Sequence, residues 1–400
     1  MAGNFPKPGQ KQLFVDISEL INRDVKTGIQ RVVRSIANSW LANPPADYCV
    51  RPVYATLEGG YRHAHKDSPF STNDPDIMDE PIEFATGDIF VGLDLQVHMV
   101  VTQRAFLREL KLRGVAVYFV VYDLLCVTCP ECFPEGSHED FLQWLDVVSE
   151  SDGAMCISQS VEKELQCWMT ENAKKPLGSF YTGWFHLGAD VENSLPSKGM
   201  PEEAPKVLSQ LALRPTFLMV GTLEPRKGHA QVLDAFDLLW QDHQQINLVI
   251  IGKPGWLVDD LLSYIQQHSL LNVQLFFLSG ISDEYLTKVY AASRCLIAAS
   301  YDEGFGLPLI EAAQHQLPLI ARDIPVFREV AAEQAYYFNS RHPEALATTI
   351  TQWLNLYENS SHPKSENISW LTWQESANNL LQGIVELQSS EYKSDHGDVK

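Results

Sequence analysis

The chain has 400 residues, of which 45% are hydrophobic, and this length predicts two or three domains. A net charge of −21 argues against duplex DNA or RNA as a main partner. No run reaches the roughly 18 apolar residues that a membrane span needs, and the N-terminus lacks the apolar core of a signal peptide. We therefore expect a cytoplasmic protein whose contact with a membrane is at most peripheral, at the inner face of the cytoplasmic membrane.

Along the first half of the chain, short apolar runs alternate with amphipathic segments, which predicts strands alternating with helices. The strands are expected at residues 12–17, 48–55, 88–95, 115–123 and 153–158. The helices are expected near residues 28–41, 100–113, 138–150 and 159–171. This alternation is typical of a Rossmann-like domain, which we expect to cover residues 1–190.

Thr27 and Gly28 precede the first of these helices. A glycine at a helix N-terminus, after the first strand of a Rossmann-like domain, can bring backbone N–H groups close to a phosphate. Such turns are also common as purely structural features. Two interpretations of Gly28 therefore stay open: it binds a phosphate, or it has only a structural role in the turn.

Cys126, Cys129 and Cys132 have a double C-x-x-C spacing that could hold zinc or part of an iron–sulfur cluster. No fourth ligand follows at a familiar distance, and His138 is only a loose candidate. The chain has seven cysteines, an odd number that favours reduced thiols over a disulfide framework. We therefore expect no metal site.

Residues 191–214 are polar and contain three prolines, which indicates a linker. After them, strands are expected at residues 216–223, 246–252, 273–280, 294–300, 317–321 and 335–338. Continuous apolar strands between amphipathic helices predict a second Rossmann-like domain, at residues 215–367, with a parallel sheet covered on both faces. A last helix at 368–388 and a disordered tail at 389–400 are expected to follow. Two such domains imply a cleft between them.

The stretch "YDEGFGLPLIEAA", residues 301–313, carries Glu303 and Glu311 on either side of two glycines and a proline. Glycine permits close ligand approach, and Pro308 suits the first turn of a helix. We expect Glu303 in a loop after a strand and Glu311 in the opening turn of the next helix, both facing a crevice at the carboxyl end of the strand. The alternative is that Glu311 only complements the helix dipole.

Arg226 and Lys227 follow another predicted strand and precede a helix. A guanidinium and an ammonium side by side at a strand's carboxyl end could bind a diphosphate. Surface basic residues are common, but the presence of the Glu303 to Glu311 loop in the same domain favours a binding role.

These motifs together resemble glycosyltransferase family 4, most strongly from "VGTLEPRKGH" to "GFGLPLIEAAQHQLPLIARDIPVFREV". Members of this family have an α/β fold, GT-B, with two Rossmann-like doubly wound domains facing an interdomain cleft. They transfer sugars with retention of anomeric configuration. Glu303 and Glu311 match the family's Glu-x7-Glu motif, and Arg226-Lys227 matches its basic pair.

The resemblance implies that a nucleotide sugar is the donor substrate, with no metal and no other cofactor. Glu311 would bind the ribose hydroxyls and Glu303 the transferred sugar, while Arg226 and Lys227 would bind the diphosphate. The backbone amides that would face the sugar and diphosphate are those of Phe305, Gly306 and Leu307. The domain of residues 1–190 would bind the acceptor.

The segments "TGIQRVVR", "GWFHLGAD" and "GISDEYLTKVYAAS" resemble bacterial mannosyltransferases that build O-antigen or capsular polysaccharide. This implies GDP-mannose as donor, a growing lipid-linked or surface polysaccharide as acceptor, and other polysaccharide-assembly enzymes as partners. Three alternatives stay open: a rhamnosyltransferase that uses dTDP-rhamnose, a GT-B sugar-nucleotide epimerase, and a catalytically silent partner that binds a sugar nucleotide.

The chain departs from the family at one position. Many relatives have His-Asp at the end of the fourth strand of the first domain, where this chain has Tyr122-Asp123. Asp123 remains a catalytic candidate in the cleft, and His98 and His186 are candidates for the missing histidine. We favour His186, because it adjoins the linker and therefore the expected cleft.

Overall fold

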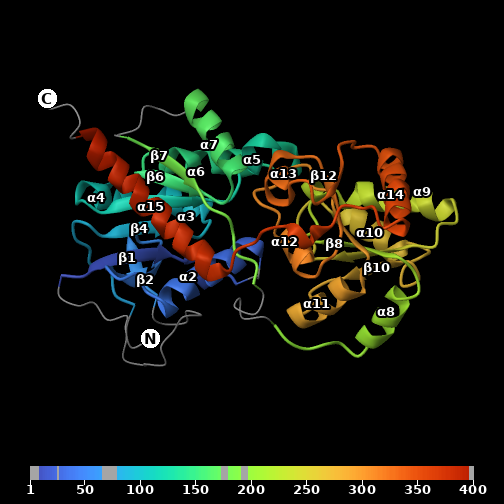
Figure 1. Cartoon of the computed structure of the whole chain (residues 1–400). Helices are drawn as coiled ribbons and strands as arrows, with labels where there is room; N and C mark the ends of the chain where they lie inside the picture. Colours follow the sequence, from blue (N-terminus) through green and yellow to red (C-terminus); the bar gives the residue numbers. More distant parts are fainter. Residues whose placement is uncertain (1–8, 25–26, 65–78, 173–178, 191–196, 396–400) are drawn as a thin grey trace. The chain divides into compact units, whose positions relative to one another are not determined.

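The structure is a computed structural model that describes residues 9–24, 27–64, 79–172, 179–190 and 197–395. The chain divides into two compact units (Figure 1). Unit 1 consists of residues 1–127, 136–190 and 371–400, and unit 2 consists of residues 128–135 and 191–370. The predicted α/β class with two Rossmann-like domains is confirmed, and each unit is described below on its own.

Unit 1 has a seven-stranded sheet in the order β3-β2-β1-β4-β5-β6-β7. All neighbouring strands are parallel except β2 and β3, which are antiparallel. The strands are β1 (Lys11–Asp16), β2 (Tyr48–Ala55), β3 (Tyr61–His63), β4 (Ile89–Gly92), β5 (Ala116–Val121), β6 (Gly153–Cys156) and β7 (Tyr181–Trp184). The sequence analysis missed β3 and β7, which are short strands at the two edges of the sheet.

The helices of this part are α1 (Ser18–Asn22), α2 (Gly28–Ala42), α3 (Val97–Thr102), α4 (Arg104–Leu112), α5 (Leu125–Thr128), α6 (Ser137–Val148), α7 (Gln159–Asn172) and α15 (Trp373–Asp395). The capping box at the start of α2 explains why that helix begins where it does: Thr27 Oγ1 accepts from the Gln30 N–H, and the Gln30 side chain accepts from the Thr27 N–H.

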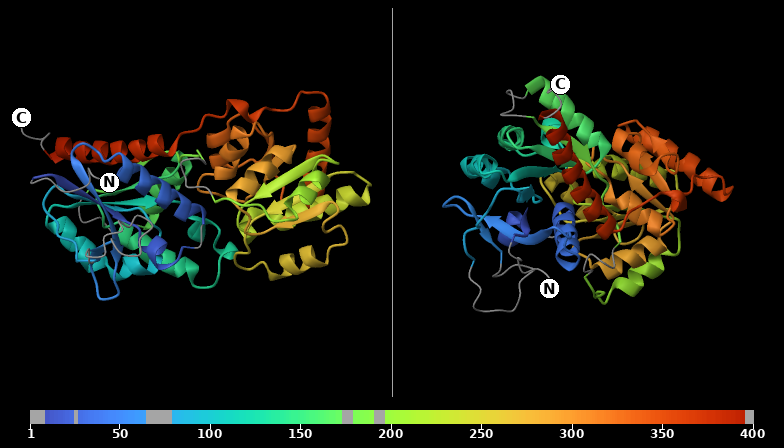
Figure 2. Two further views of the ribbon diagram at one scale, coloured as in Figure 1. Left: turned by 90° about the horizontal axis from the view of Figure 1, so that it is seen from below. Right: turned by 60° about the vertical axis from the view of Figure 1, so that its left-hand side comes forward.

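The last helix, α15, lies along unit 1 beside α2 in Figures 1 and 2. The indole N–H of Trp40 in α2 donates to the carbonyl of Ala377 in α15 at 3.0 Å. The chain therefore returns to its first unit after completing the second. The helix starts at Trp373 and continues to Asp395, beyond the predicted end at residue 388. Most of the predicted tail is thus helical, and residues 396–400 lie outside the described part of the chain.

Unit 2 has a six-stranded, fully parallel sheet in the order β10-β9-β8-β11-β12-β13. The strands are β8 (Thr216–Val220), β9 (Asn247–Ile251), β10 (Leu275–Leu278), β11 (Cys295–Ala298), β12 (Leu319–Arg322) and β13 (Tyr336–Phe338). The helices are α8 (Ala204–Leu211), α9 (His229–Gln241), α10 (Asp259–Gln267), α11 (Asp283–Ala292), α12 (Leu307–Gln314), α13 (Pro325–Ala331) and α14 (Pro343–Glu358). Short 3-10 turns are η1 (Pro130–Cys132), η3 (Pro225–Lys227) and η4 (Ser365–Asn367).

The core of unit 2 forms where α9 and α14 cover the sheet. Phe217 in β8 makes edge-to-face contacts with Phe236 in α9 and Trp353 in α14, with ring centroids 5.6 and 5.5 Å apart. All three side chains are fully buried. Aromatic pairs of this geometry stabilise a core beyond the area they bury. These contacts therefore hold β8 against α9 and α14.

Two segments belong to unit 2 although their sequence did not indicate it. Residues 197–214, expected as linker, contain α8 and contact α11, where Ser197 donates from its N–H to Asp283 at 2.7 Å. Residues 191–196 of the expected linker lie outside the described part. Residues 128–135 also pack in unit 2, where the Trp256 indole N–H donates to the Cys132 carbonyl at 2.8 Å.

No helix in the described ranges is both long enough and apolar enough to cross a membrane.

Two carboxyl groups are buried where β1 and β4, neighbours in the sheet of unit 1, come to an end. Asp16 accepts from the N–H of Ser18 at 3.0 Å and from the hydroxyl of Tyr61 at 3.3 Å, and Asp94 accepts from the N–H of Leu20 at 2.8 Å. Burial, together with the charge of Asp94, raises the pKa of Asp16 to about 7 despite these hydrogen bonds. Burial raises the pKa of Asp94 to about 6. Both groups favour the protonated state below neutral pH.

The buried Asp16 predicts that unit 1 loses stability as pH rises. In the unfolded chain Asp16 titrates near 3.8, whereas in the folded protein it keeps its proton up to about pH 7. Between these values the folded state binds more protons, so the free energy of unfolding falls with rising pH. We expect the melting temperature to fall between about pH 5 and about pH 7 and Asp16→Asn to flatten that slope, measured by differential scanning fluorimetry. The exposed Asp242→Asn is the control, and an unchanged slope in Asp16→Asn would contradict the prediction.

Candidate active site

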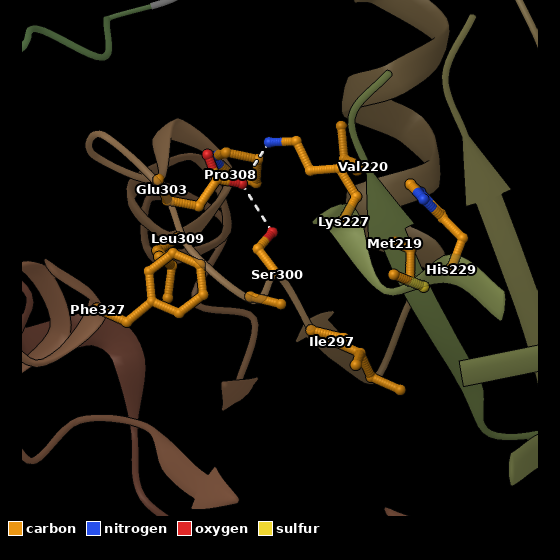
Figure 3. A pocket seen from close by; sticks show the side chains of 13 residues that line it. Met219, Val220, Lys227, His229, Ile297, Ser300, Glu303, Pro308, Leu309 and Phe327 are labelled. Atoms are coloured by element: carbon orange, nitrogen blue, oxygen red, sulfur yellow. Dashed lines mark hydrogen bonds and ion pairs between the residues drawn. The ribbon is translucent and has the colours of Figure 1, made fainter. Parts of the chain in front are cut away.

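The candidate site lies at the topological switch point of unit 2, where ligands bind in open α/β sheets. β8 and β11 are neighbours in the sheet, but the chain continues from β8 to β9 on one side and from β11 to β12 on the other. The loops that follow β8 and β11 border a pocket of about 350 Å³. Figure 3 shows Lys227, Ser300 and Glu303 among the side chains that line it.

Glu303 is the centre of an ion-pair cluster. Its Oε2 lies 3.0 Å from Nη1 of Arg226. Its Oε1 accepts from Lys227 and, at 2.7 Å, from the hydroxyl of Ser300 (Figure 3). Arg226 also pairs through Nε with the buried Glu224, at 2.8 Å. Arg226, Lys227, Glu224 and Glu303 therefore form one network of ion pairs. Arg226 and Lys227, predicted as a pair able to bind a diphosphate, are already paired with carboxylates here.

The cluster holds Glu303 in its charged form. Burial alone would raise the pKa of Glu303, but the positive charges of Lys227 and Arg226, with hydrogen bonds from Lys227 and Ser300, lower it to about 2. Burial lowers the pKa of Lys227 and, in spite of the neighbouring cations, raises that of Glu224. Glu303 is consequently a permanent carboxylate, whose charge Lys227 and Arg226 neutralise.

His229 also lines the pocket and was not predicted from the sequence. The side chain is buried, and its Nδ1 has no hydrogen-bond partner among the described residues. Burial, together with the charges of Lys227 and Arg226, lowers its pKa to about 3. The imidazole is therefore neutral at physiological pH.

The glycine-containing turn after β11 takes the conformation that the sequence predicted. Gly306 has a φ of 101° and is the N-cap of α12, with Leu307 and Pro308 as the first two helical residues. A Cβ on Gly306 would lie 2.6 Å from Leu309 and 2.8 Å from Phe327. The neighbouring Phe305 is buried and anchors the turn. The backbone N–H groups of the first turn of α12 therefore open onto the loop that carries Glu303.

Arg322 braces the same loop from β12. Its guanidinium donates to the carbonyls of Ala299 at 3.0 Å and Ser340 at 2.9 Å, and it lies over the ring of Tyr301 at 4.7 Å. The side chain is buried, and burial lowers its pKa to about 10. Arg322 thus contacts both neighbours of Ser300, the carbonyl of Ala299 and the ring of Tyr301, and is not among the residues that line the pocket.

Glu311 is the fifth residue of α12 and so lies one residue past the opening turn in which it was expected. The position weakens the alternative that it merely complements the helix dipole, because that effect fades beyond the first turn. Its side chain is 6% exposed, and its Oε2 accepts from the hydroxyl of Tyr290 in α11 at 2.9 Å. The carboxylate is thus fixed by a neighbouring helix.

The other predicted site residues lie in unit 1. Gly28 is the first residue of α2, and open space surrounds the position a Cβ would take. Asp123 follows β5 and accepts from the N–H of Leu125 at 3.1 Å, an interaction that starts α5. His186 follows β7, its ring lies 5.0 Å from that of Trp184, and its carbonyl accepts from Ser376. All three follow parallel strands and so belong to the carboxyl edge of this sheet.

Tyr122 is at the position where the resemblance to family 4 led us to expect a histidine. It is buried, and its hydroxyl donates to the carbonyl of Leu93 at 2.7 Å. The side chain is therefore a structural link between the ends of β4 and β5. His98, the other candidate, is exposed, and its Nε2 lies 3.8 Å from a carboxylate oxygen of Asp140.

The cysteine-rich segment is divided between the units, since Cys126 belongs to unit 1 and Cys129 and Cys132 belong to unit 2. Within the described ranges, the group of side chains that meets a metal-site geometry is Cys129, Glu131 and Cys132, whose ligand atoms lie within 4.8 Å of one another. His138 instead contacts the Cys126 carbonyl through Nδ1 at 2.8 Å. The predicted absence of a metal at these cysteines remains a prediction.

Residues 202–370 match the family described as glycosyl transferases group 1. The matched range contains Arg226, Lys227, Glu303 and Glu311 and covers nearly all of unit 2.

Over almost its whole length the chain is similar to curated mannosyltransferases. It is 46% identical over 392 residues to a serotype-specific mannosyltransferase, WbdA, from Escherichia coli, an alignment that covers 96% of this chain and 48% of WbdA. It is 31% identical to O-antigen chain mannosyltransferase B from Escherichia coli over 38% of this chain and 40% of that protein. The chain thus spans about half the length of WbdA.

Solved structures show the same fold at low sequence identity. Anabaena Alr3699/HepE in complex with UDP matches with a TM-score of 0.61 and 16% identity, over 95% of this chain and 100% of that chain. Sucrose-phosphate synthase from Thermosynechococcus elongatus matches with a TM-score of 0.62 and 17% identity, over 95% and 100% of the two chains. The GT-B fold class predicted from the sequence is therefore confirmed.

The sequence analysis missed Tyr290, Arg322, His229 and Glu224 as parts of this site. A weak signal existed for all four: Glu224 and His229 flank the predicted Arg226-Lys227 pair, and Tyr290 and Arg322 are in segments already quoted for their resemblance. That signal did not reveal the role of Arg322, because its contacts join residues far apart in the chain.

Gly306 offers a direct test of how tightly the turn before α12 is packed. We expect Gly306→Ala to lower the free energy of unfolding by roughly 2–4 kcal/mol, because it adds backbone strain at positive φ and overpacks Leu309 and Phe327. Gly280→Ala is a matched control, since Gly280 also has a positive φ, of 67°, but nothing lies within 4 Å of the added Cβ. Urea unfolding measures both, and equal losses would mean that packing at Gly306 is not tight.

Proposed function

We propose that this chain is a retaining, metal-independent glycosyltransferase that moves mannose from GDP-mannose onto a growing lipid-linked or surface polysaccharide such as an O-antigen. The observation that carries the reaction class is the buried cluster of Arg226, Lys227 and Glu303 at the switch point of the sheet, beside the N-terminus of α12. The 46% identity to WbdA over 96% of this chain supports mannose as the sugar.

The diphosphate of a nucleotide sugar would bind Arg226 and Lys227 in place of the Glu303 carboxylate. Arg226 and Lys227 are held in place by Glu303, so no unpaired buried charge exists before the donor arrives. A diphosphate offers the same cations more negative charge and bidentate geometry for the guanidinium. Its binding would displace Glu303 from the cations and release that carboxylate toward the hydroxyls of the sugar.

The backbone at the start of α12 complements the cations. The N–H groups of Phe305, Gly306 and Leu307 lie in the tight turn before or at the helix N-terminus, where partial positive charge favours phosphate oxygens. Glu311, in the next turn, would accept hydrogen bonds from the ribose hydroxyls. Sugar, diphosphate and ribose would thus bind along one loop and helix.

Transfer with retention follows from the resemblance to family 4. The bond between the anomeric carbon and the phosphate oxygen breaks while the acceptor hydroxyl oxygen forms its bond to the same carbon from the same face. The hydroxyl proton passes to an oxygen of the departing diphosphate. Arg226 and Lys227 would stabilise the negative charge that develops on this leaving group, which is where preorganised charge contributes most.

The acceptor side is assigned to unit 1. Gly28 would bring the N-terminus of α2 to a phosphate, while Asp123 and His186 would contact the acceptor or the reacting groups. A lipid-linked acceptor would bring the enzyme to the inner face of the cytoplasmic membrane by peripheral contact, next to other enzymes of polysaccharide assembly.

Glu311→Gln should weaken nucleotide binding, because a charge-assisted hydrogen bond contributes roughly 1.5–3 kcal/mol. The expected result is a fall of about 10- to 100-fold in affinity for GDP, measured by isothermal titration calorimetry. Glu358→Gln, a substitution of an exposed glutamate at the end of α14, is the control. Unchanged GDP affinity in a folded Glu311→Gln protein would refute the ribose assignment.

Transfer should survive excess EDTA, because the side chains of Arg226 and Lys227 supply the positive charge that a metal would otherwise supply. Elemental analysis of the purified protein should likewise find no zinc retained by Cys129 and Cys132. Loss of transfer on chelation, restored by a divalent cation, would show that the charge assignment is wrong.

The donor is tested by offering labelled GDP-mannose and dTDP-rhamnose, each with synthetic mannosyl and rhamnosyl acceptors. We expect product from GDP-mannose with the mannosyl acceptor. Product from dTDP-rhamnose alone would overturn the donor assignment but leave the transferase mechanism standing, and an epimerised donor formed without an acceptor would overturn the transferase itself.

A further inference from the structure

Tyr290 of α11 contacts a residue that the proposed function places against the donor. Its hydroxyl donates to Oε2 of Glu311 at 2.9 Å, and the tyrosine is 2% exposed. A side chain this deeply buried acts through its neighbours. The segment "GISDEYLTKVYAAS", in which Tyr290 lies, has no other role in the site described above.

The contact has a second point of support on the same helix. Glu311 lies in α12, and His315, four residues later, is the C-cap of that helix. Their side chains therefore lie on one face of the helix. The ring of His315 stacks on that of Tyr290, with centroids 5.0 Å apart and an angle of 15° between the planes. Burial lowers the pKa of His315, so the stacked ring is neutral. Tyr290 is thus fixed by its ring to His315 and by its hydroxyl to Glu311.

We propose that Tyr290 is a positioning residue, which holds the Glu311 carboxylate in the orientation that the ribose hydroxyls of the donor require. The inference rests on the proposed role of Glu311. A free glutamate side chain loses rotational freedom when it binds a ligand, and this loss weakens binding. Tyr290 reduces that loss, because its hydroxyl fixes one oxygen of the Glu311 carboxylate.

The test is Tyr290→Phe, which removes the hydroxyl and keeps the ring that stacks on His315. We expect affinity for GDP, UDP or ADP, whichever the wild type binds most tightly, to fall roughly tenfold, and KM for the donor to rise by a similar factor with kcat unchanged. With the 2′,3′-dideoxy analogue of the same nucleotide, wild type and variant should bind equally. A merely structural role would weaken both nucleotides alike.

The matched control is Tyr285→Phe on the same helix. Tyr285 is also buried, but its hydroxyl has no hydrogen-bond partner among the described residues. Its removal should leave nucleotide affinity unchanged. Melting temperatures of both variants show whether each protein is folded.

Combining Tyr290→Phe with Glu311→Gln separates the two assignments. If Tyr290 acts through Glu311, the double variant should bind the nucleotide no more weakly than Glu311→Gln alone. Additive losses, or unchanged affinity in Tyr290→Phe while Glu311→Gln is impaired, would overturn this inference alone. Unchanged affinity in Glu311→Gln, or no binding of any of the three nucleotides by the wild type, would overturn the proposed donor site and this inference with it.

Discussion

The ion pairs that Glu303 makes with Lys227 and Arg226 join two loops whose residues are 76 and 77 positions apart in the chain. Parallel strands place these loops at the same edge of the sheet, because β8 and β11 are neighbours. The approach is close: a Cβ on Gly228 would lie 2.5 Å from the carbonyl oxygen of Ala299. The contacts of Arg322 with Ala299 and Tyr301 hold the second of these loops in place.

Electrostatics explains why this pairing persists in a buried site. A buried cation without a partner is costly, and so is a buried carboxylate. Here the positive charges of Arg226 and Lys227 are balanced by Glu224 and Glu303, and burial lowers the pKa of Lys227 while the cations hold that of Glu303 at about 2. The charges of these four side chains therefore cancel, and their ion pairs hold the two cations in fixed positions.

Local patterns in the sequence were sufficient for most of this site. The apolar run at 294–300, the glycines and Pro308 indicated a strand, a tight turn and a helix, and the structure has β11, the positive φ of Gly306 and α12 in that order. Such signals are local because each depends on the conformational preference of one residue or the period of one segment. The pattern placed the start of α12 well enough to predict the turn, but not well enough to put Glu311 in its correct turn.

The features that sequence missed are contacts between distant segments. Tyr290 in α11 contacts Glu311 in α12, and Arg322 in β12 contacts the carbonyl of Ala299. Trp40 in α2 contacts α15. Hydrophobic period reveals that a residue is buried but not which segment covers it. The same limit explains why residues 197–214 were taken for a linker: their polar composition hid a helix that contacts α11.

The two units repeat one topology but fill its switch point differently. In each sheet the first strand of the unit lies between its second and fourth strands, β1 between β2 and β4, and β8 between β9 and β11. In unit 2 the two loops at this point carry the cations and Glu303. In unit 1 the ends of the corresponding strands carry Asp16 and Asp94, whose pKa values burial raises to about 7 and about 6. Buried carboxyl groups offer an anion no positive charge, whereas Arg226 and Lys227 of unit 2 do, and this difference supports the proposal that a negatively charged donor binds unit 2.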